Sequence, residues 1–338
     1  MRKIFVDMAV EPAFLKKLKQ IKEVSVDIVE QWTEQQRKYP CGRIEDVEIL
    51  FCTFVPANFS DMKKLKFIQI SSSGYSQLFG LGLVEKGIRA CNARGVFDIP
   101  IAEWNIAMMI NLARNLRQMI RNQEKGIWER TAEFQNEIRG KIVGFWGYGG
   151  IARETARIAA QLGLKIYVLV PDGRIKKREN IYCVEGTGDP DGKIPDKVFS
   201  LQQKKEFLAG IDFLILSMPL TEKTKGVIGE EELRTLKKGS FLLNPARGSL
   251  IKEEALIKVL KDGHLGGAAI DTHYYYPMPP DHPLWKFPNV IMTPHISGSA
   301  LSPHFLERIW TIFFENVIRF LNDRPLLNEL TAEQLKGM

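Results

Sequence analysis

The chain alternates between short apolar runs and longer segments in which apolar residues recur at helical spacing. In residues 1–100 the apolar runs predict strands at 3–7, 24–29, 47–51, 67–70 and 88–91. Residues 12–21, between the first two runs, follow a helical period instead. Strands that alternate with helices in this way predict a parallel sheet covered by helices.

A second alternating series begins at Gly140. Its predicted strands are 141–146, 165–170, 212–217, 240–244, 268–271 and 290–293, and helices at 151–162, 230–236 and 253–260 separate several of them. About six strands with crossover helices are typical of a dinucleotide-binding sheet. Residues 172–200 are rich in Gly, Pro, Asp and Lys without a clear period, and they predict a long surface loop.

Two helical segments define the expected domain organisation. Apolar residues recur at helical spacing through 102–116, which predicts a helix connecting two domains. A second helical pattern follows Pro294 and is too short to form a domain, so we expect it to pack on the first domain. The resulting prediction is an α/β protein with one domain at 1–100 and 296–338 and the other at 101–295.

Composition and charge narrow the class of protein. Of the 338 residues, 45% are apolar and 26% are charged, which is typical of a globular protein. The chain starts with charged residues and has no long apolar run, so we expect a cytoplasmic protein with no membrane partner. The net charge is +7, but Lys and Arg alternate with Glu, and we expect no nucleic-acid partner. The spacing of the four cysteines matches no metal site, and we expect none.

A glycine-rich motif follows the predicted strand 141–146. The sequence is Gly147-Tyr148-Gly149-Gly150-Ile151-Ala152, and a predicted helix comes next. In this G-x-G-x-x-A pattern, Gly147 permits a tight turn, Gly149 lets a pyrophosphate approach the backbone, and Ala152 permits close packing. Amides at the helix N-terminus would bind the anion. The motif predicts a dinucleotide site, and the alternative is a simple tight turn.

The end of the next predicted strand bears on the choice between NAD and NADP. Val170 stands where an acidic residue would hold the adenosine ribose, whereas Asp172 lies two positions further on. Arg174, Lys176, Lys177 and Arg178 follow, and such residues attract a 2′-phosphate. The pattern favours NADP over NAD. Alternatively, Asp172 reaches the ribose and the basic run is solvated.

Three further motifs carry a family resemblance. They are Ser217-Met218-Pro219-Leu220-Thr221 with Thr224, Asn244-Pro245-Ala246-Arg247-Gly248, and Thr293-Pro294-His295. With the glycine-rich motif, their order and spacing resemble the D-isomer-specific 2-hydroxyacid dehydrogenases over nearly the whole chain, most closely at 140–299. The resemblance implies a doubly wound Rossmann domain for NAD(P), at 101–295, inserted in a discontinuous flavodoxin-like substrate domain. It also implies a homodimer.

The resemblance assigns roles to residues. Arg247 would bind and polarise the substrate, because a guanidinium grips a carboxylate. His295 would be the general acid/base, because its pKa lies near neutrality. Backbone amides of Ser72, Ser73 and Gly74 would bind the substrate carboxylate, and Asp271 would lie near the nicotinamide. Further coenzyme contacts are expected from Tyr148, Gly150, Ile151, Met218, Pro219, Thr224, Pro245, Ala246 and Gly298, together with Arg247 and His295.

The sequence departs from the family at two positions. Tyr276 occupies the place of the Glu that normally pairs with the catalytic His. A phenol can orient the imidazole but supplies no charge, so we expect a lower pKa for His295 and a more acidic optimum for reduction. Asp281 or Glu103 could serve as the partner instead, or the tyrosines could merely pack a loop. Phe97 replaces an Asn of the family's second substrate loop, which leaves the substrate open.

These patterns support one function over two alternatives. We expect an enzyme that transfers hydride between NAD(P)H and a small 2-keto acid such as glyoxylate or hydroxypyruvate, or the reverse. One alternative is a nucleotide-sensing regulator without catalysis, which the replacement of Glu by Tyr276 would suit. The other is a formate- or phosphite-type dehydrogenase, for which no additional motif is present.

Overall fold

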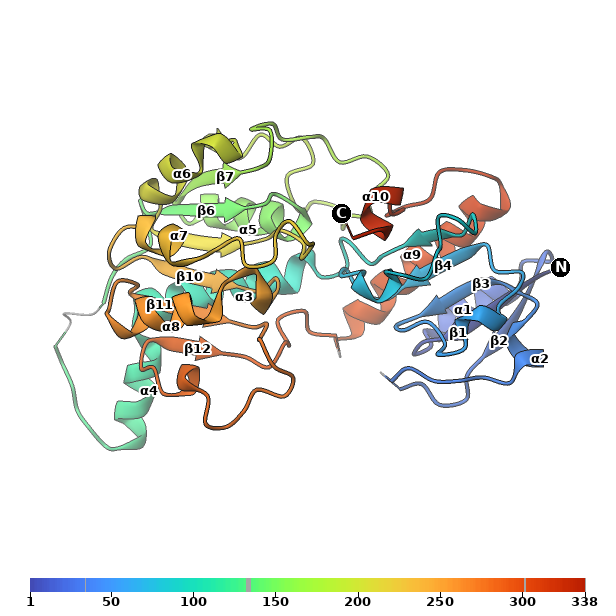
Figure 1. The fold of residues 1–338 in the computed structure, drawn as a ribbon, viewed down its shortest axis with the longest axis horizontal. Helices are drawn as coiled ribbons and strands as arrows, with labels where there is room; N and C mark the ends of the chain where they lie inside the picture. Colours follow the sequence, from blue (N-terminus) through green and yellow to red (C-terminus); the bar gives the residue numbers. More distant parts are fainter. Residues whose placement is uncertain (34, 132–134, 301, 338) are drawn as a thin grey trace. The chain divides into compact units, whose positions relative to one another are not determined.

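The computed structural model describes residues 1–33, 35–131, 135–300 and 302–337, which form two compact units (Figure 1). Unit 1 comprises 1–97, 179–184 and 300–338, and unit 2 comprises 98–178 and 185–299. The chain therefore contributes a short internal segment, 179–184, to unit 1 from within the sequence of unit 2.

Unit 1 contains a five-stranded parallel sheet with strand order β2-β1-β3-β4-β5. Its strands are β1 Arg2–Asp7, β2 Val24–Ile28, β3 Val47–Cys52, β4 Phe67–Ile70 and β5 Arg89–Cys91. Its helices are α1 Pro12–Lys19, α2 Cys41–Ile44, α9 Pro303–Leu321 and α10 Ala332–Leu335. The order 2-1-3-4-5 is that of flavodoxin-like sheets, so the predicted fold class of this unit is confirmed.

The C-terminal helix α9 is part of the core of unit 1. Ser302 caps the helix by accepting the amide of His304 at 3.3 Å, and Pro303 begins it. Trp310 and Phe313 are fully buried, and the ring of Phe313 stacks on Phe51 of β3 at 4.2 Å between centroids. Because this helix completes the core begun by residues 1–97, the predicted discontinuity of the fold is confirmed.

Unit 2 contains a seven-stranded parallel sheet with strand order β12-β11-β10-β9-β6-β7-β8. Its strands are β6 Ile142–Trp146, β7 Lys165–Leu169, β8 Lys197–Phe199, β9 Phe213–Leu216, β10 Phe241–Asn244, β11 Gly267–Ile270 and β12 Val290–Met292. The order contains the doubly wound Rossmann arrangement with one further strand at the edge. The expectation of a loop throughout 172–200 was wrong at β8, which pairs with β7.

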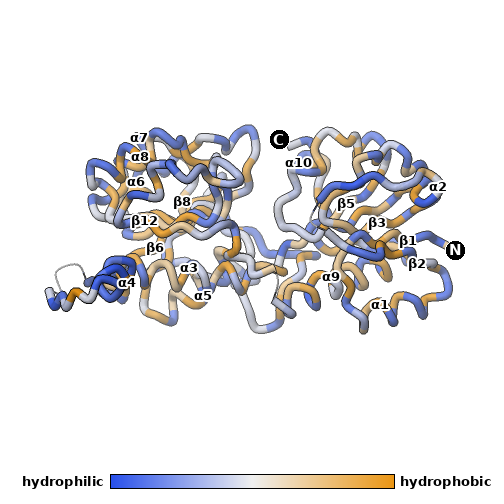
Figure 2. The backbone as a smooth tube through the Cα atoms, turned by 90° about the horizontal axis from the view of Figure 1, so that it is seen from below, coloured by the Kyte–Doolittle hydropathy of each residue, from blue (hydrophilic) through white to orange (hydrophobic). Residues whose placement is uncertain are grey.

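Helices cover both faces of this sheet (Figure 1). Helix α3 Asp98–Ala113 and α5 Gly150–Gln161 pack on one face, and α6 Lys204–Gly210, α7 Glu230–Thr235 and α8 Glu253–Lys261 pack on the other. The expected continuous helix 102–116 was wrong in extent. It begins at Asp98 and ends at Ala113, and Asn115, with φ of 45°, separates it from α4 Leu116–Glu124. Figure 2 shows that α4 is largely hydrophilic.

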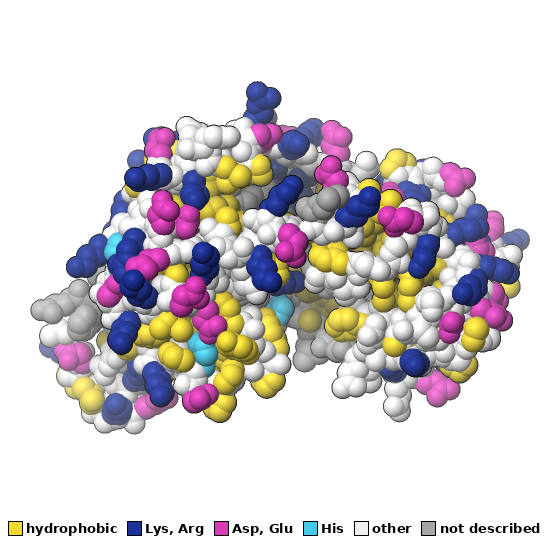
Figure 3. Space-filling view, viewed as in Figure 1, with side chains coloured by type: hydrophobic (Ala, Val, Ile, Leu, Met, Phe, Trp, Pro, Cys, Tyr) yellow, Lys and Arg dark blue, Asp and Glu magenta, His cyan; other side chains and the backbone are white. Residues whose placement is uncertain are grey.

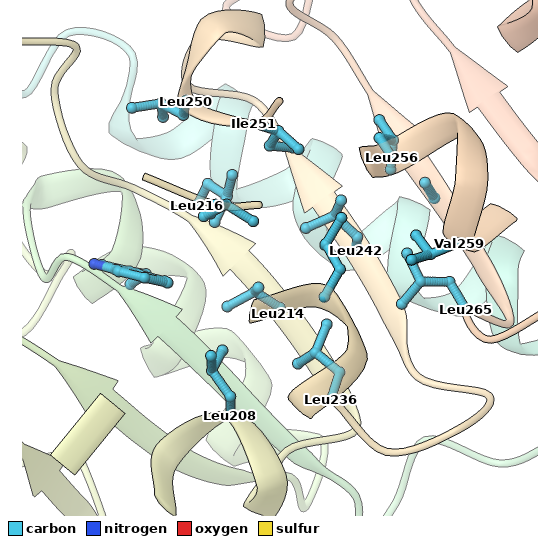
Figure 4. Close-up of a cluster of buried hydrophobic side chains, with 14 of the residues drawn as sticks. Leu208, Leu214, Leu216, Leu236, Leu242, Leu250, Ile251, Leu256, Val259 and Leu265 are labelled. Atoms are coloured by element: carbon cyan, nitrogen blue, oxygen red, sulfur yellow. The ribbon is translucent and has the colours of Figure 1, made fainter. Parts of the chain in front are cut away.

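The core on the second face is built mainly from leucines (Figure 4). Leu214 of β9 and Leu242 of β10 are fully buried, and side chains from α6 and α8 surround them. These apolar strands fix the positions of the loops at their carboxyl ends, where ligands bind in open α/β sheets.

The exterior carries mixed charge. Basic and acidic side chains are interspersed on the face drawn in Figure 3. Among the helices of the described residues, none combines the length and apolar character needed to cross a membrane.

Candidate active site

The glycine-rich loop joins β6 to α5, and its own backbone is accessible for contact with a ligand. Gly147 has φ of +94°, and a Cβ there would lie 2.8 Å from the carbonyl oxygen of Ser217. Its N–H donates to the carbonyl of Leu169 at 2.9 Å, which ties the loop to the end of β7. At Gly149, the residue preceding α5, a Cβ would meet no heavy atom of the described chain within 4 Å. The open side of Gly149 and the N-terminal amides of α5 have the chemistry to bind a dinucleotide pyrophosphate.

Gly150 is required for a different reason. A Cβ at this position would overlap the carboxylate of Asp98, the buried first residue of α3. That carboxylate pairs with Arg178 at 3.3 Å. The sequence analysis did not predict the pair of Asp98 and Arg178. The one feature that could have indicated it is that Asp98 is an acidic residue at the start of a helix.

Two residues of the loop take part in internal packing and bonding. The Tyr148 phenol is buried and donates to Oδ2 of Asp189 at 2.8 Å. Burial and the Asp189 carboxylate raise the pKa of Tyr148. Ile151 lies in the first turn of α5, and its carbonyl accepts the Thr155 hydroxyl at 2.8 Å.

Asp172 and Arg174 form one exposed turn after β7. Oδ1 of Asp172 accepts the backbone N–H of Arg174 at 3.2 Å. Asp172 also forms an isolated bridge with Ser200. Because β6 and β7 are parallel neighbours, this turn and the glycine-rich loop lie at the same edge of the sheet.

The loop after β9 is organised by Thr224. Its hydroxyl accepts the amide of Thr221 at 2.8 Å and donates to the carbonyl of Pro219 at 2.7 Å. Met218 is buried, and its amide nitrogen lies 3.0 Å from the position of a Cβ at Gly147. The Met218–Pro219 backbone therefore lies beside the glycine-rich loop.

The turn after β10 is held by Asn244. Its Oδ1 accepts the amides of Ala246 at 3.1 Å and Arg247 at 3.2 Å, and its Nδ2 donates to the carbonyl of Arg247 at 2.9 Å. Pro245 lies within this turn. Nη1 of Arg247 donates to the carbonyl of Ala246 at 2.7 Å. Burial lowers the pKa of Arg247, although Tyr276 acts in the opposite direction.

His295 lies on the loop after β12 and has a left-handed backbone with φ of +58°. The hydroxyl of Tyr276 lies 3.1 Å from its Nδ1 and accepts the backbone N–H of His273 at 3.2 Å. Among the described residues, the bond to Nδ1 comes from Tyr276 rather than from Asp281 or Glu103. Displacement of water by surrounding atoms and the Arg247 cation lower the pKa of His295, and Asp271 partly opposes them.

Asp271 and His273 hold the loop that carries His295. Asp271 is fully buried, and its carboxylate accepts the Thr293 hydroxyl at 2.6 Å, the Ile296 amide at 2.9 Å and the Ser297 hydroxyl at 2.5 Å. Nε2 of His273 lies 2.7 Å from the carbonyl of Thr293. A non-glycine residue in the left-handed region is strained, and these bonds offset that strain. Gly298 follows Ser297 on the same loop.

In unit 1 the predicted substrate loop follows β4. The Ser72 hydroxyl donates to the carbonyl of Gly74 at 2.7 Å, and the Ser73 hydroxyl donates to the carbonyl of Ala93 at 3.1 Å. Phe97 stacks on Phe305 at 5.4 Å in the core of this unit. The Ser72 and Ser73 hydroxyls thus bond the loop to its own backbone and to the chain at Ala93.

The unit 2 candidates, predicted from separate motifs, are gathered at one sheet edge. They follow the carboxyl ends of β6, β7, β9, β10, β11 and β12. Within the described residues, no group of three or more His, Cys, Asp or Glu side chains is arranged to hold a metal. Sequence reasoning missed the positioning roles of Asn244, Ser297 and His273, and for His273 the sequence offered no signal.

Comparison with known proteins agrees with this arrangement. Residues 106–297 match the model of the D-isomer specific 2-hydroxyacid dehydrogenase NAD binding domain. The chain is 28% identical to a glyoxylate reductase of Thermofilum pendens over 94% of its own length and 91% of that protein. It is 31% identical to a D-3-phosphoglycerate dehydrogenase of Dictyostelium discoideum over 78% of its length and 61% of that protein. A glyoxylate reductase structure from Paecilomyes thermophila shares the fold, with a TM-score of 0.80, 22% identity and coverage of 98% and 99%.

Proposed function

The chain belongs to the D-isomer specific 2-hydroxyacid dehydrogenase family, and we propose that it reduces a small 2-keto acid with NAD(P)H or oxidises the corresponding D-2-hydroxy acid. Glyoxylate and hydroxypyruvate are the proposed substrates. The observation that carries the proposal is the placement of Arg247, His295 and the glycine-rich loop at one edge of the unit 2 sheet.

We propose that unit 2 binds the coenzyme. The turn at Gly147 and the open side of Gly149 support a pyrophosphate contact there. Asp172 and Arg174 are the proposed contacts to the adenosine ribose, with NADP favoured over NAD because the basic residues follow. Met218, Pro219 and Thr224, with Pro245, Ala246, Asp271 and Gly298, are the proposed remaining contacts.

Arg247 and His295 have complementary roles in the proposed reaction. The Arg247 guanidinium binds the substrate carboxylate and polarises the adjacent carbonyl. The reduced nicotinamide, when bound, supplies the hydride. The protonated imidazole of His295 donates a proton to the carbonyl oxygen, and in the reverse direction the neutral imidazole accepts it.

Tyr276 is the proposed partner of His295 in place of a carboxylate. When its phenol oxygen accepts Nδ1–H, Nε2 is the nitrogen that gains or loses the exchanged proton, which is what the proposed reaction requires in both directions. The backbone N–H of His273 fixes the phenol oxygen from the other side. Tyr276 thus orients the imidazole without contributing a negative charge.

In unit 1 we propose that Ser72, Ser73 and Gly74 bind substrate through their backbone amides. The support is the set of side-chain bonds that holds this loop at the end of β4. A preorganised loop loses little conformational entropy when an anion binds to it.

The test is the absorbance of the reduced nicotinamide during incubation with glyoxylate or hydroxypyruvate and either NADPH or NADH. We expect oxidation of the coenzyme, and a loss of at least about 100-fold in kcat for His295→Asn. Arg247→Met should lose activity as well. His304→Asn, at an exposed position in unit 1, is the matched control and should retain wild-type rates.

Other outcomes would change the proposal. Tight coenzyme binding without turnover across a panel of 2-keto acids would contradict the enzyme and favour a nucleotide-sensing regulator. Turnover of formate or phosphite without turnover of any 2-keto acid would favour the other dehydrogenase class.

We also propose a homodimer that forms through unit 2. Several large apolar side chains are exposed on and after α3, including Leu116 at 41% and Ile120 at 47%. Ile120 lines a hollow together with Trp285 and Met292. Exposed apolar patches of this kind commonly mark protein interfaces.

A further inference from the structure

The long loop between β7 and β8 is tied to the start of α5 by polar side chains that the proposed reaction does not use. Arg153 and Glu154 lie in α5, yet they are only 3% and 2% exposed. Buried charged side chains are rare unless they are bonded. Their bonds lead to the loop, which has no regular secondary structure from the end of the Asp172 turn to β8.

Arg153 links three main-chain carbonyls. Nε donates to Tyr148 in the glycine-rich loop at 3.2 Å, and Nη2 donates to Lys176 at 2.7 Å. Nη1 donates to the carbonyl of Asp189. Because the guanidinium is rigid and planar, it fixes the glycine-rich loop and two distant points of the β7–β8 loop relative to one another.

Asp189 and Glu154 add further attachments. The Asp189 carboxylate accepts the Tyr148 phenol at 2.8 Å and the amide of Lys193 at 2.9 Å. Glu154 accepts the amide of Gly188 at 2.5 Å. A Cβ at Gly192 would lie 2.3 Å from Cγ2 of Ile175, so the two arms of the loop are packed tightly together.

We propose that Arg153 is a positioning residue that holds the β7–β8 loop in a preformed arrangement, in which Arg174, Lys176 and Lys177 bind a phosphate on the adenosine ribose of the coenzyme. This proposal rests on the coenzyme site proposed above. Arg153 bonds to the main chain of Lys176, and the exposed side chains of residues 174, 176 and 177 lie in the first part of the loop that follows the end of β7 at Leu169. Ordering the loop in advance reduces the entropy lost when a phosphate binds.

The experiment compares coenzyme affinities and loop protection in the whole protein. Dissociation constants for NADPH and NADH are measured by fluorescence titration, and trypsin cleavage after residues 174–178 is followed by mass spectrometry. The variants are Arg153→Met, Arg153→Lys and, as a control, Lys205→Met at an exposed position of α6. Thermal midpoints show whether each variant is folded.

We expect the wild-type protein to bind NADPH more tightly than NADH. In folded Arg153→Met, the ratio of the NADH to the NADPH dissociation constant should fall about tenfold. Trypsin should cleave its β7–β8 loop about tenfold faster than in the wild type. Arg153→Lys should resemble Arg153→Met, because an ammonium cannot span three carbonyls. Lys205→Met should match the wild type in both measurements.

Three results would overturn the inference. They are equal or tighter wild-type binding of NADH, an unchanged coenzyme ratio in folded Arg153→Met, and unchanged cleavage in that variant. If the Arg153 variants do not fold, Arg174→Ser with Lys177→Ser decides, because these exposed changes should weaken NADPH alone. A wild-type protein that binds neither coenzyme would instead contradict the proposed function itself.

Discussion

The phenol oxygen of Tyr276 lies 3.1 Å from Nδ1 of His295, and it also accepts the backbone N–H of His273 at 3.2 Å. The proposed acid/base is thereby oriented by a neutral hydroxyl. Burial and the nearby Arg247 cation lower the pKa of His295. A group that must donate a proton is then in its active form only at more acidic pH.

Tyr276→Glu should move the pH profile of reduction toward alkaline pH. The protonated fraction of His295 falls as pH rises through its pKa, so the rate of reduction falls there too. A carboxylate beside Nδ1 favours the imidazolium and raises that pKa, which should shift the falling limb of kcat/KM by about one pH unit or more. Tyr276→Phe should slow the reaction without an alkaline shift. The measurement is kcat/KM for glyoxylate across pH.

Tyr275→Phe is the matched control for this pair. Its hydroxyl bonds to Glu253 at 3.1 Å rather than to His295, so its profile should match the wild type. If Tyr276→Glu leaves the profile unchanged, the side chain at position 276 does not act on the protonation of His295.

Asp271→Asn should disturb the loop that carries His295. The carboxylate accepts bonds on both oxygens, and an amide would place a donor against the donors of Ser297 or Ile296. Leaving such groups unpaired costs about 1–3 kcal/mol of stability. We expect a lower thermal midpoint and a lower kcat, as measured by calorimetry and steady-state kinetics.

Asp212→Asn is the control for Asp271→Asn, and it separates a loss of overall stability from a change in the position of His295. Asp212 accepts the amide of Ile142 at 2.8 Å at the opposite end of the sheet. We expect it to lower the thermal midpoint while kcat stays at the wild-type value. Equal losses of kcat in both variants would mean that Asp271 acts through general stability.

The fold was predictable where local sequence determines local structure. The strand β6 and the turn at Gly147 follow from an apolar run and a glycine motif, and both appear where the pattern placed them. The three-residue strand β8 did not stand out, because it lies in a Gly- and Lys-rich stretch and exists through pairing with β7. The break at Asn115 was hidden by an apolar pattern that continues across it.

The motifs identified the candidate side chains but not all of their partners. The family resemblance put Tyr276 beside Asp281 and Glu103 as possible partners of His295, and only the fold shows which of the three makes the bond, because no periodicity reports such a distance. Likewise, segment 179–184 belongs to unit 1 because Tyr182 donates its amide to Asn328 at 3.0 Å. Contacts between residues so far apart in the chain depend on the completed fold.

Gly147→Ala should weaken coenzyme binding through the backbone. The residue has φ of +94°, and a Cβ would lie 2.8 Å from the carbonyl oxygen of Ser217, which cannot move as a side chain could. We expect a loss of at least about tenfold in coenzyme affinity, as measured by titration calorimetry, because the turn must shift.

Gly140→Ala is the control, because it introduces backbone strain at a positive φ without a steric clash of the new Cβ. Gly140 has φ of +77°, and a Cβ there would meet no heavy atom of the described chain within 4 Å. This variant should lose about 1 kcal/mol of stability and keep its coenzyme affinity. If Gly147→Ala binds coenzyme like Gly140→Ala, the close approach to Ser217 is not needed for the site.

Ile120→Glu should dissociate the proposed homodimer. The side chain is 47% exposed on α4, and a buried unpaired carboxylate at an interface would cost several kcal/mol. Light scattering after size exclusion should give twice the 38.5 kDa chain mass for the wild type and the single chain mass for the variant. Leu201→Glu is the matched control, because Leu201 is similarly exposed, at 45%, near β8 in the same unit. It should remain dimeric. A wild-type protein that elutes as a monomer would contradict the homodimer, and a dimeric Ile120→Glu would place the interface elsewhere.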